Sequence, residues 1–392
     1  MNPGDFPSKR AGCLAEVPAR ESYLAFVPNV LPPAITWDDG LVSLLSDADR
    51  AVTALEGIGR SLPNPHLLMM PFVRQEAVLS SRIEGTQTTL LQLYAFEAWK
   101  EVRPDMPADV REVRNHVVAL EHGLELLQTT PVSRRLLCAV HAKLMEGVRG
   151  ERWRPGEFRD GPVYVGPPGL SLADAPFVPP PVPEMQQALD DLERFLNTDL
   201  DMPALVRIAI SHYQFEAIHP FFDGNGRVGR LLIILLLCAW GLLTEPLLYL
   251  SAYFERHRQD YYDSLMAVSQ RGAWEAWLCF FLDGVRTQAL DATRRAQRLE
   301  HLRQSYRVRI QASASSTRLF EAIDLLFRQP IITAASVAQD LGVGRSTAHR
   351  YVQALQDTGI IIEMTGRSRD REYIAHEIIR AIQDPLPHET EA

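Results

Sequence analysis

The sequence predicts a mainly α-helical protein with a winged helix-turn-helix domain at its C-terminal end. From about residue 38 to 290, apolar residues recur at three- and four-residue spacing with Gly or Pro at the breaks, which is typical of packed helices. After residue 316, three shorter helical patterns precede two strand-like runs around a Gly-Arg-Ser turn. A chain of 392 residues is too long for one ordinary core, so two or three domains are expected.

The elements follow in order along the chain. The proline-punctuated residues 1–37 predict an extended arm. Helical patterns come next, and examples are LVSLLSDADRAVTALEGIG, DVREVRNHVVALEHGLELLQ and SRRLLCAVHAKLMEGV. Residues 154–184 interrupt them, because their prolines and glycines forbid a helix, while VYV at 163–165 favours a strand, so we expect a loop or short hairpin. A charged helical connector is predicted over residues 290–313.

Composition and charge limit the class of protein. A net charge of −9 argues against a protein that coats nucleic acid along its whole surface, although a local basic face stays open. The four cysteines have no metal-ligand or redox spacing, and the N-terminus lacks the apolar stretch of a signal peptide. The longest apolar run, Leu231 to Leu243, is well short of the roughly 18 to 20 residues that span a bilayer. We expect a cytoplasmic protein with no membrane partner.

The most informative stretch is HPFFDGNGRVGR, which begins at His219 and leads into an apolar run. If that run is a helix starting near Gly224, the backbone N–H groups of Gly224, Asn225 and Gly226 lie at its positive end, which favours an anion. The two arginines that follow are three residues apart and point to the same side of the first turn. They are Arg227 and Arg230.

The two remaining polar residues of this stretch indicate a reaction. A carboxylate beside an anion site, here Asp223, is favourable only if a divalent cation shares the site, which predicts a polyphosphate with magnesium. An imidazole beside a phosphate, here His219, suits removal of a proton from an attacking hydroxyl. Together they predict phosphoryl or nucleotidyl transfer. Phe221 is expected to face the core.

HPFFDGNGRVGR matches every fixed position of the HPFx(D/E)GNGRxxR signature, and through it the chain resembles Fic-domain proteins. The resemblance covers roughly residues 76–282 and includes SHYQFEAIHP, PGEFRDGPVYVG, FVPPPVPEM and YYDSL. It implies a Fic-type helical bundle with a β-hairpin flap. It also implies transfer of AMP from ATP, with Mg²⁺, to a Ser, Thr or Tyr hydroxyl of a target protein. Self-modification and a homodimer are further expectations from this resemblance.

The resemblance also implies a role for each matching residue. His219 would be the base, Asp223 the magnesium ligand and Arg230 the partner of the γ-phosphate. Residues 159–168 resemble the flap, which lines the nucleotide and pairs with the target's backbone. Other implied nucleotide-binding residues are Gly224, Asn225, Gly226 and Arg227 at the phosphates, Gly229 beside them, Val165 and Gly166 in the flap, and Tyr261 and Tyr262 near the base. Ser269 stands where some relatives carry asparagine, which leaves the nucleotide base open.

A second motif precedes this core. VLSSRIEGTQ contains Ser80, Glu84 and Gly85, which fit the (S/T)xxxE(G/N) inhibitory motif of Fic proteins. A carboxylate placed on Arg230 would form a charge-assisted pair and remove the cation meant for the γ-phosphate. The resemblance therefore implies restraint in cis by an N-terminal helix.

Several alternatives stay open at this stage. The same site would also suit removal of AMP with Glu84 orienting a water, or transfer of another phosphate-containing group. The chain would otherwise be a DNA-binding regulator whose Fic core senses nucleotide, since DNA binding and protein docking fit the winged helix equally well. His212, Glu216 and His219 share a helical face, as zinc ligands would, although a hydrogen-bonded helix end is the commoner arrangement.

The predicted domain boundaries follow from these patterns. Residues 1–105 would form the arm and the helical region with the inhibitory motif, and residues 106–295 the Fic catalytic core. Residues 296–392 would form the connector helix and the winged helix-turn-helix domain, with basic residues on its recognition helix and wing.

Overall fold

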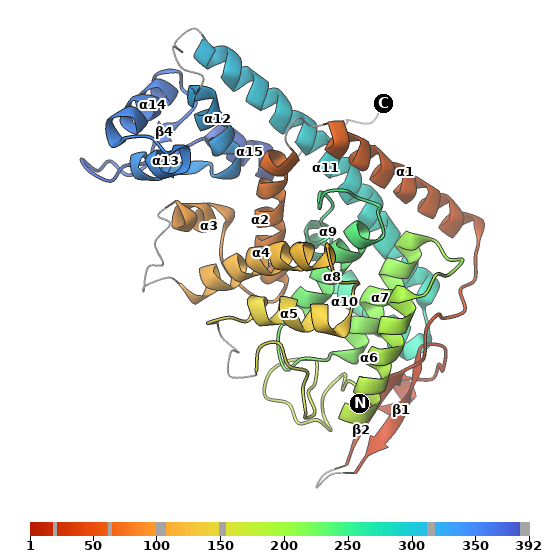
Figure 1. Cartoon of the computed structure of the whole chain (residues 1–392). Helices are drawn as coiled ribbons and strands as arrows, with labels where there is room; N and C mark the ends of the chain where they lie inside the picture. The colour runs from red at the N-terminus through yellow and green to blue at the C-terminus, as the bar shows by residue number, and fades with distance from the viewer. Residues whose placement is uncertain (19–21, 62–64, 99–106, 149–153, 312–317, 385–392) are drawn as a thin grey trace.

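The computed structural model describes residues 1–18, 22–61, 65–98, 107–148, 154–311 and 318–384 (Figure 1). Its strands are β1 (Gly12–Val17), β2 (Tyr23–Pro28), β3 (Ile331–Thr333), β4 (Ile362–Glu363) and β5 (Glu372–Ile374). Its helices are α1 (Asp39–Ser61), α2 (Pro65–Ile83), α3 (Leu90–Glu97), α4 (Ala108–Leu127), α5 (Arg134–Leu144), α6 (Val182–Asn197), α7 (Ala204–Ile218), α8 (Asn225–Ala239), α9 (Ser251–Arg256), α10 (Arg258–Arg271), α11 (Trp274–Gln311), α12 (Arg318–Arg328), α13 (Ala334–Leu341), α14 (Arg345–Asp357) and α15 (His376–Gln383). A mainly helical fold is confirmed.

Helix α8 is the centre of the larger bundle. Nearly every residue from Arg227 to Leu237 is buried, as expected for a helix that is apolar all round. It packs against α7, α4, α5 and α2, which surround it in Figure 1. Because α8 begins with the polar Asn225 and continues with LLIILLL, its N-terminal end is the point where polar groups meet the core.

The N-terminal arm is a β-hairpin, which the sequence did not predict. β1 and β2 pair antiparallel from Gly12 opposite Pro28 to Val17 opposite Tyr23. Phe26 is buried, and its ring centroid lies 5.6 Å from that of Phe177. The Phe26 N–H donates to the Val178 carbonyl at 2.8 Å. The prolines mark only the ends of this segment, so the hairpin is stabilised by its contact with the residues before α6.

The predicted connector is the second half of one long helix. α11 begins at Trp274 and runs to Gln311 without a proline, and its first half is buried in the bundle along α1. The predicted boundary between residues 295 and 296 therefore lies within α11, and the boundary between 105 and 106 lies outside the described residues. The domain boundaries stay predictions.

The winged helix-turn-helix domain has the predicted order of three helices and two strands, with two additions. β3 joins the sheet in the order β3-β5-β4, and α15 is the last helix of the described residues. β3 is too short to show the alternation of apolar and polar residues that predicts a strand. It is recognised only by its pairing with β5. The domain lies against the larger bundle, because α12 and α15 pack on α2 and the Gln329 amide donates to the Tyr94 carbonyl at 2.7 Å.

Among the residues that the structure describes, no helix combines the length and hydropathy needed to cross a bilayer.

Candidate active site

The loop between α7 and α8 brings two helix ends to one place. His219 ends α7 with its backbone in the left-handed region, at φ 49° and ψ 62°. Gly224 precedes α8 with φ 77°, a conformation that favours glycine. The helix therefore starts where the sequence predicted. A histidine at positive φ is uncommon, so contacts with its surroundings must hold His219 in this conformation.

Side chains inside the loop fix its shape. The Asn225 amide donates to the Phe221 carbonyl at 2.8 Å, and its oxygen accepts from the Phe221 N–H at the same distance. Phe221 is buried, as predicted, and stacks on His141 at 3.8 Å between ring centroids. His141 Nε2 lies 3.1 Å from the Asp223 carbonyl. The Asn225 side chain thus shapes the loop, and its backbone N–H is what remains for an anion.

His219 has the environment of a neutral imidazole. Its Nδ1 lies 3.3 Å from the Glu216 carbonyl, an arrangement in which Nδ1–H donates and Nε2 keeps its lone pair. Burial lowers the pKa of His219 to about 4. An unprotonated Nε2 at neutral pH is the state that a general base requires.

A cavity of about 460 Å³ opens beside His219 and joins the flap to the start of α8. The predicted site residues that line it are Glu84, Val165, Gly166, His219, Gly226, Arg230, Tyr261 and Tyr262. The predicted residues that do not line it are Ser80, Gly85, Asp223, Gly224, Asn225, Arg227 and Gly229. The cavity has the size of a nucleotide pocket, with a base, a cation and a helix N-terminus at one end.

The predicted inhibitory residues meet Arg230. The Arg230 guanidinium donates from Nε to the Ser80 hydroxyl at 2.8 Å, and from Nη2 to the Ser80 carbonyl at 2.9 Å and the Glu84 carboxylate at 2.7 Å. Burial acts to raise the pKa of Glu84, but the ion pair with Arg230 outweighs it and leaves that pKa lowered. Gly85, at φ 98°, ends the turn that follows α2. Glu84 is therefore an ionised partner of Arg230.

The same carboxylate covers the start of α8. A Cβ atom placed on Gly226 would lie 2.3 Å from Glu84 Oε1, so the carboxylate rests directly on the backbone of the first turn. A negative group at this position interacts favourably with the helix N-terminus. Glu84 thus occupies the position where the sequence predicts a phosphate.

Arg227 and Asp223 form the other side of the helix start. Arg227 is buried, with Nη1 3.5 Å from the Glu112 carboxylate and Nη2 3.7 Å from the Asp223 carboxylate. Asp223 keeps 47 % of its side chain exposed and accepts from the Gly224 N–H at 2.6 Å. No group of three or more His, Cys, Asp or Glu side chains able to hold a metal occurs in the described part of the chain. One exposed carboxylate suits magnesium, which commonly takes one or two carboxylates with substrate phosphates and water.

Comparison with known families identifies this arrangement. Residues 42–125 match the model described as Fic/DOC family N-terminal, residues 131–237 match the Fic/DOC family, and residues 318–368 match an HTH domain. The chain is a Fic-domain protein with a C-terminal helix-turn-helix domain. The His219 loop, Arg230 and the start of α8 all lie within the match to the Fic/DOC family.

Curated relatives carry the same domain in longer proteins. The chain is 27% identical over 198 residues to "Protein adenylyltransferase Fic" of Culex quinquefasciatus, which covers 48% of this chain and 35% of that protein. It is 28% identical over 166 residues to the protein of that name from Drosophila ananassae, covering 41% of this chain and 31% of the relative. The chain thus spans about a third of the length of these relatives.

One solved structure shares the overall fold. A Fic family protein from Desulfovibrio desulfuricans G20 aligns with a TM-score of 0.53 at 24% identity, over 88% of this chain and 98% of that one. The likeness therefore extends beyond the Fic domain to most of the chain, as a likeness of fold.

The far end of the Fic cavity is aromatic and apolar. Tyr261 is buried, and its hydroxyl lies 2.8 Å from His212 Nε2, whereas Tyr262 is 37% exposed and partly open to the cavity. Ser269, the residue that left the base open, shares a 2.8 Å hydrogen bond with the Tyr213 hydroxyl. Val165 and Gly166 line the cavity from the flap, which is joined to the following segment by a single bridge from Val165 to Phe177. The predicted hairpin is thus reduced to one bridge.

Two further sequence interpretations are settled by contacts. Gly229 lies away from the cavity, and a Cβ there would meet Glu216 Oε1 at 2.2 Å, so its smallness makes room for Glu216. The zinc alternative gains no support, because His212 uses both nitrogens, one on the Gly229 carbonyl at 3.0 Å and one on Tyr261. His212 thus joins α7 to α8.

Sequence reasoning missed Arg258 and Arg159, and it considered Glu216 only as a zinc ligand. Glu216 and Arg258 line the cavity, and burial raises the pKa of Glu216 to about 8. Arg159 is buried beside the His219 carbonyl, which its Nε reaches at 2.9 Å. A charged residue inside GEFRDG, flanked by turn formers, is the signal that would have drawn attention to Arg159.

Proposed function

We propose that this protein is an adenylyltransferase that moves AMP from ATP to a Ser, Thr or Tyr hydroxyl of a protein. The observation that carries the proposal is the convergence of neutral His219, the backbone of Gly226 and the Arg230 guanidinium on one cavity. The names of the curated relatives support the same activity. Ser269 gives no support for a particular base, so ATP is proposed from the relatives alone.

The chemistry follows from the positions of these groups. His219 Nε2 takes the proton of the target hydroxyl as its oxygen forms a bond to the α-phosphorus of ATP. The bond from the α-phosphorus to its bridging oxygen breaks, and pyrophosphate leaves with that oxygen. The backbone at Asn225 and Gly226 and the Arg227 side chain would hold the α- and β-phosphates. Arg230 would hold the γ-phosphate once Glu84 releases it.

Asp223 would hold a magnesium ion, which when bound neutralises part of the charge on the phosphates. Its exposed carboxylate, next to the helix start, supports this role. The flap, residues 159–168, would pair with an extended segment of the target, and the half-buried Val163, Tyr164 and Val165 support such a docking edge. Self-modification and a homodimer belong to this proposal as expectations from the Fic resemblance, and a cytoplasmic location belongs to it as an expectation from composition and the lack of a signal-peptide pattern.

Glu84 restrains the reaction in this proposal. Its carboxylate pairs with Arg230 and covers Gly226, so it competes with the γ-phosphate for both the cation and the helix N-terminus. ATP then binds with its phosphates displaced, and its α-phosphorus is out of line with the attacking oxygen.

A test uses wild type, Glu84→Gly and Glu84→Gly/His219→Ala with α-labelled ATP and magnesium, with and without lysate. Label in protein with the single mutant only supports both the transferase and its restraint. If no protein is labelled by any variant, the proposal fails. Incubation with an AMP-modified protein and mass spectrometry then tests removal of AMP.

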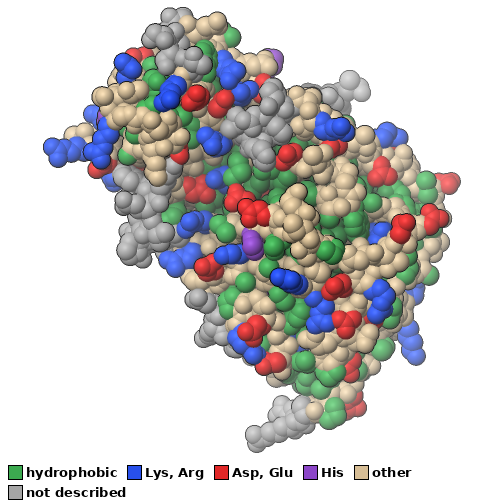
Figure 2. All heavy atoms as spheres, viewed as in Figure 1, with side chains coloured by type: hydrophobic (Ala, Val, Ile, Leu, Met, Phe, Trp, Pro, Cys, Tyr) green, Lys and Arg blue, Asp and Glu red, His purple; other side chains and the backbone are tan. Residues whose placement is uncertain are grey.

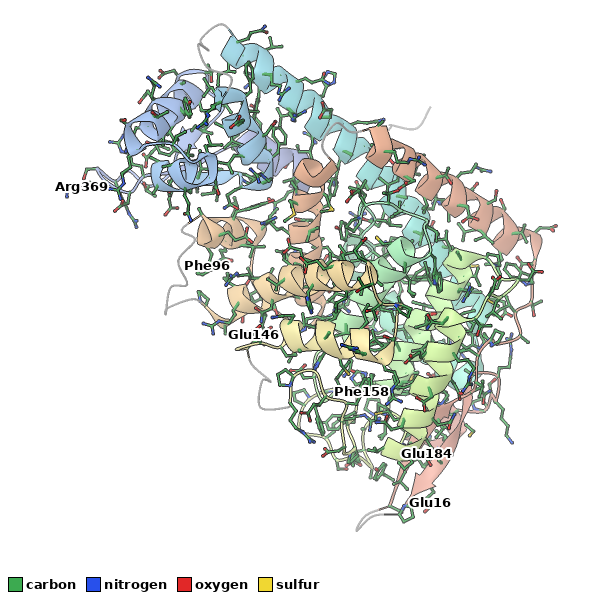
Figure 3. The ribbon with its side chains drawn as sticks, in the orientation of Figure 1. Glu16, Phe96, Glu146, Phe158, Glu184 and Arg369 are labelled. Carbon is green, nitrogen blue, oxygen red and sulfur yellow. The ribbon has the colours of Figure 1, made fainter. Side chains whose placement is uncertain are left out.

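A second function, DNA binding, is favoured by the exposed face of α14. Arg345, His349 and Arg350 are exposed on this helix, and the wing adds exposed Arg367, Arg369 and Arg371. Figure 3 places Arg369 at the tip of the wing, away from the helical bundle, and Figure 2 shows Arg side chains spread over this domain with acidic ones between them. We propose that duplex DNA binds here, with affinity that falls steeply with salt. Arg350→Ala/Arg369→Ala should abolish any such binding in an anisotropy titration, and salt-independent binding would contradict it.

A further inference from the structure

Arg159 is a buried arginine whose hydrogen-bond partners are not carboxylates. Only 1% of it is exposed, and it forms no ion pair with any acidic side chain in the described part of the chain. Burial lowers the pKa of its guanidinium to about 10. A buried cation costs free energy unless its donors are satisfied, so the contacts that satisfy Arg159 point to its role.

Backbone carbonyls of three segments satisfy it. Nε donates to the His219 carbonyl at 2.9 Å, and Nη1 donates to the Gly161 carbonyl at 3.0 Å. Nη2 donates to the Pro180 carbonyl at 2.6 Å and reaches the Ile218 carbonyl at 3.4 Å. The Arg159 N–H also donates to the Pro220 carbonyl at 2.9 Å. One residue thus joins the end of α7, the start of the flap and the segment that returns to α6.

These contacts act at the point where the chain is strained. The carbonyls of Ile218 and His219 lie at the C-terminal end of α7, where a cation is favourable. The backbone of His219 lies in the left-handed region, a conformation that contacts with the surrounding structure must stabilise. Val165, which lines the cavity, lies four residues beyond Gly161 in the flap. Hence the fork geometry of one guanidinium holds the His219 backbone and both ends of the flap together.

We propose that Arg159 is a positioning residue that fixes the His219 backbone against both ends of the flap. It thereby keeps a constant distance between the catalytic base and the edge of the flap that would bind the target. This inference rests on the proposed transferase function. Arg159 need not touch the nucleotide, and it does not line the cavity as the structure describes it. Its effect should therefore fall on the rate of transfer rather than on the binding of ATP.

Arg207 offers a matched control. It also lies on backbone carbonyls, those of Phe195 at 2.8 Å and Thr198 at 2.9 Å, and it packs over the Trp240 ring at 4.4 Å. It is at the opposite end of α7 from His219. A purely structural arginine of the same chemistry should behave like Arg207.

The experiment compares Arg159→Lys with Arg207→Lys, each in the Glu84→Gly background. Lysine keeps the charge but cannot reach carbonyls on three segments at once. We expect Arg159→Lys to lower the maximal rate of label transfer about 10- to 100-fold, because small misplacements of reacting groups cost rates of this order. The ATP concentration for half-maximal rate should change by less than about threefold, and Arg207→Lys should keep both values. A rate for Arg159→Lys equal to that of Arg207→Lys overturns the proposal.

A second measurement does not depend on activity. Hydrogen–deuterium exchange at the non-proline amides of residues 161–166 and 177–178 should be faster in Arg159→Lys and unchanged in Arg207→Lys. If Glu84→Gly transfers no label, the proposed function fails, while exchange still tests the geometry. Unchanged exchange overturns the positioning role. If Arg159→Lys does not fold while Arg207→Lys does, the residue is structural and the proposal is wrong.

Discussion

Two buried arginines, Arg230 and Arg159, hold the two sides of the Fic cavity by opposite means. Arg230 pairs with Glu84, a side chain that is 37% exposed and carries an opposite charge. Arg159 pairs with carbonyls of the backbone, and none of its partners is ionised. A contact with a partly exposed carboxylate opens when a competing anion arrives, whereas four carbonyls left without donors would be costly. The difference indicates that the contact between Arg230 and Glu84 is a switch, whereas the contacts of Arg159 with backbone carbonyls form a fixed frame.

The largest expected effect lies between the two arginines, at His219. In the Glu84→Gly background, His219→Ala should lower the rate of label transfer about 10²- to 10⁴-fold, since that is the usual contribution of a general base. Binding of ATP, measured by calorimetry, should persist because the phosphate-binding groups remain. An unchanged rate would show that His219 takes no part in the chemical step. The contacts of Arg159 with the His219 backbone would then not serve catalysis.

The next effect tests the switch. Glu84→Gly should raise the rate about 10- to 100-fold, because it frees both a charge-assisted pair and the helix N-terminus. Glu84→Gln keeps the shape and loses the charge, so its rate should fall between those of wild type and Glu84→Gly. Equal rates for wild type and Glu84→Gly, measured with the same ATP and magnesium, would show that this contact restrains nothing.

A stability comparison tests the frame. Arg159→Met leaves the carbonyls of His219, Gly161 and Pro180 without their donor, and each buried unsatisfied group costs about 1–3 kcal/mol. Arg230→Met takes the donor from one backbone carbonyl and one hydroxyl, both of Ser80, and leaves Glu84, whose partly exposed carboxylate can bind water. The urea midpoint should therefore fall further for Arg159→Met than for Arg230→Met. The reverse order would mean that the switch, and not the frame, stabilises the fold.

The smallest effect is the dependence of the rate on pH. Burial lowers the pKa of His219 to about 4, so the base is already unprotonated in mild acid. The rate of Glu84→Gly should change by less than about twofold between pH 6 and 8, whereas a free imidazole would lose activity near its usual pKa of about 6.5. A midpoint near that value in a pH–rate profile would contradict the buried, neutral base.

Inhibition of the transfer by Glu84 should persist in mildly acidic solution. The pKa of Glu84 is lowered, because the pair with Arg230 outweighs the effect of burial. A group whose pKa is depressed in the folded state contributes stability above its unfolded pKa, about 4.3 for glutamate, and loses it as the pH falls through the folded value. Wild type should therefore stay inactive across the same range, and activation on acidification to pH 6 would contradict this pairing.

The sequence predicted the helical fold and the winged helix from local patterns, and the motif at His219 together with the Fic resemblance pointed to eight of the residues that line the cavity. His219, Gly226 and Arg230 lie within one short motif, where spacing along a helix decides which side chains meet. Glu84 is far from them in sequence, yet its own motif and its charge predicted the contact with Arg230. The contact of Glu84 with Arg230 was implied by the Fic resemblance, and electrostatics supplies the physical reason for it.

The parts that were missed depend on contacts between distant segments. The N-terminal hairpin is stabilised by Phe26 against Phe177, and no pattern within residues 1–37 reports that contact. Arg159 is defined by the carbonyls of Pro180 and His219, which carry no sequence signal because every residue has a carbonyl. The assignment of Gly229 to the nucleotide came from the Fic resemblance and stays a prediction, and in the structure a Cβ on Gly229 would meet Glu216.

The most direct test of the central claim compares ATP labelled at the α-phosphate with ATP labelled at the γ-phosphate. Both are incubated with Glu84→Gly and with Glu84→Gly/His219→Ala in magnesium. The account predicts that protein is labelled from the α-position alone and only by the single mutant, with pyrophosphate released. Label from the γ-position, or equal labelling by the double mutant, would contradict transfer of AMP by His219 at this cavity.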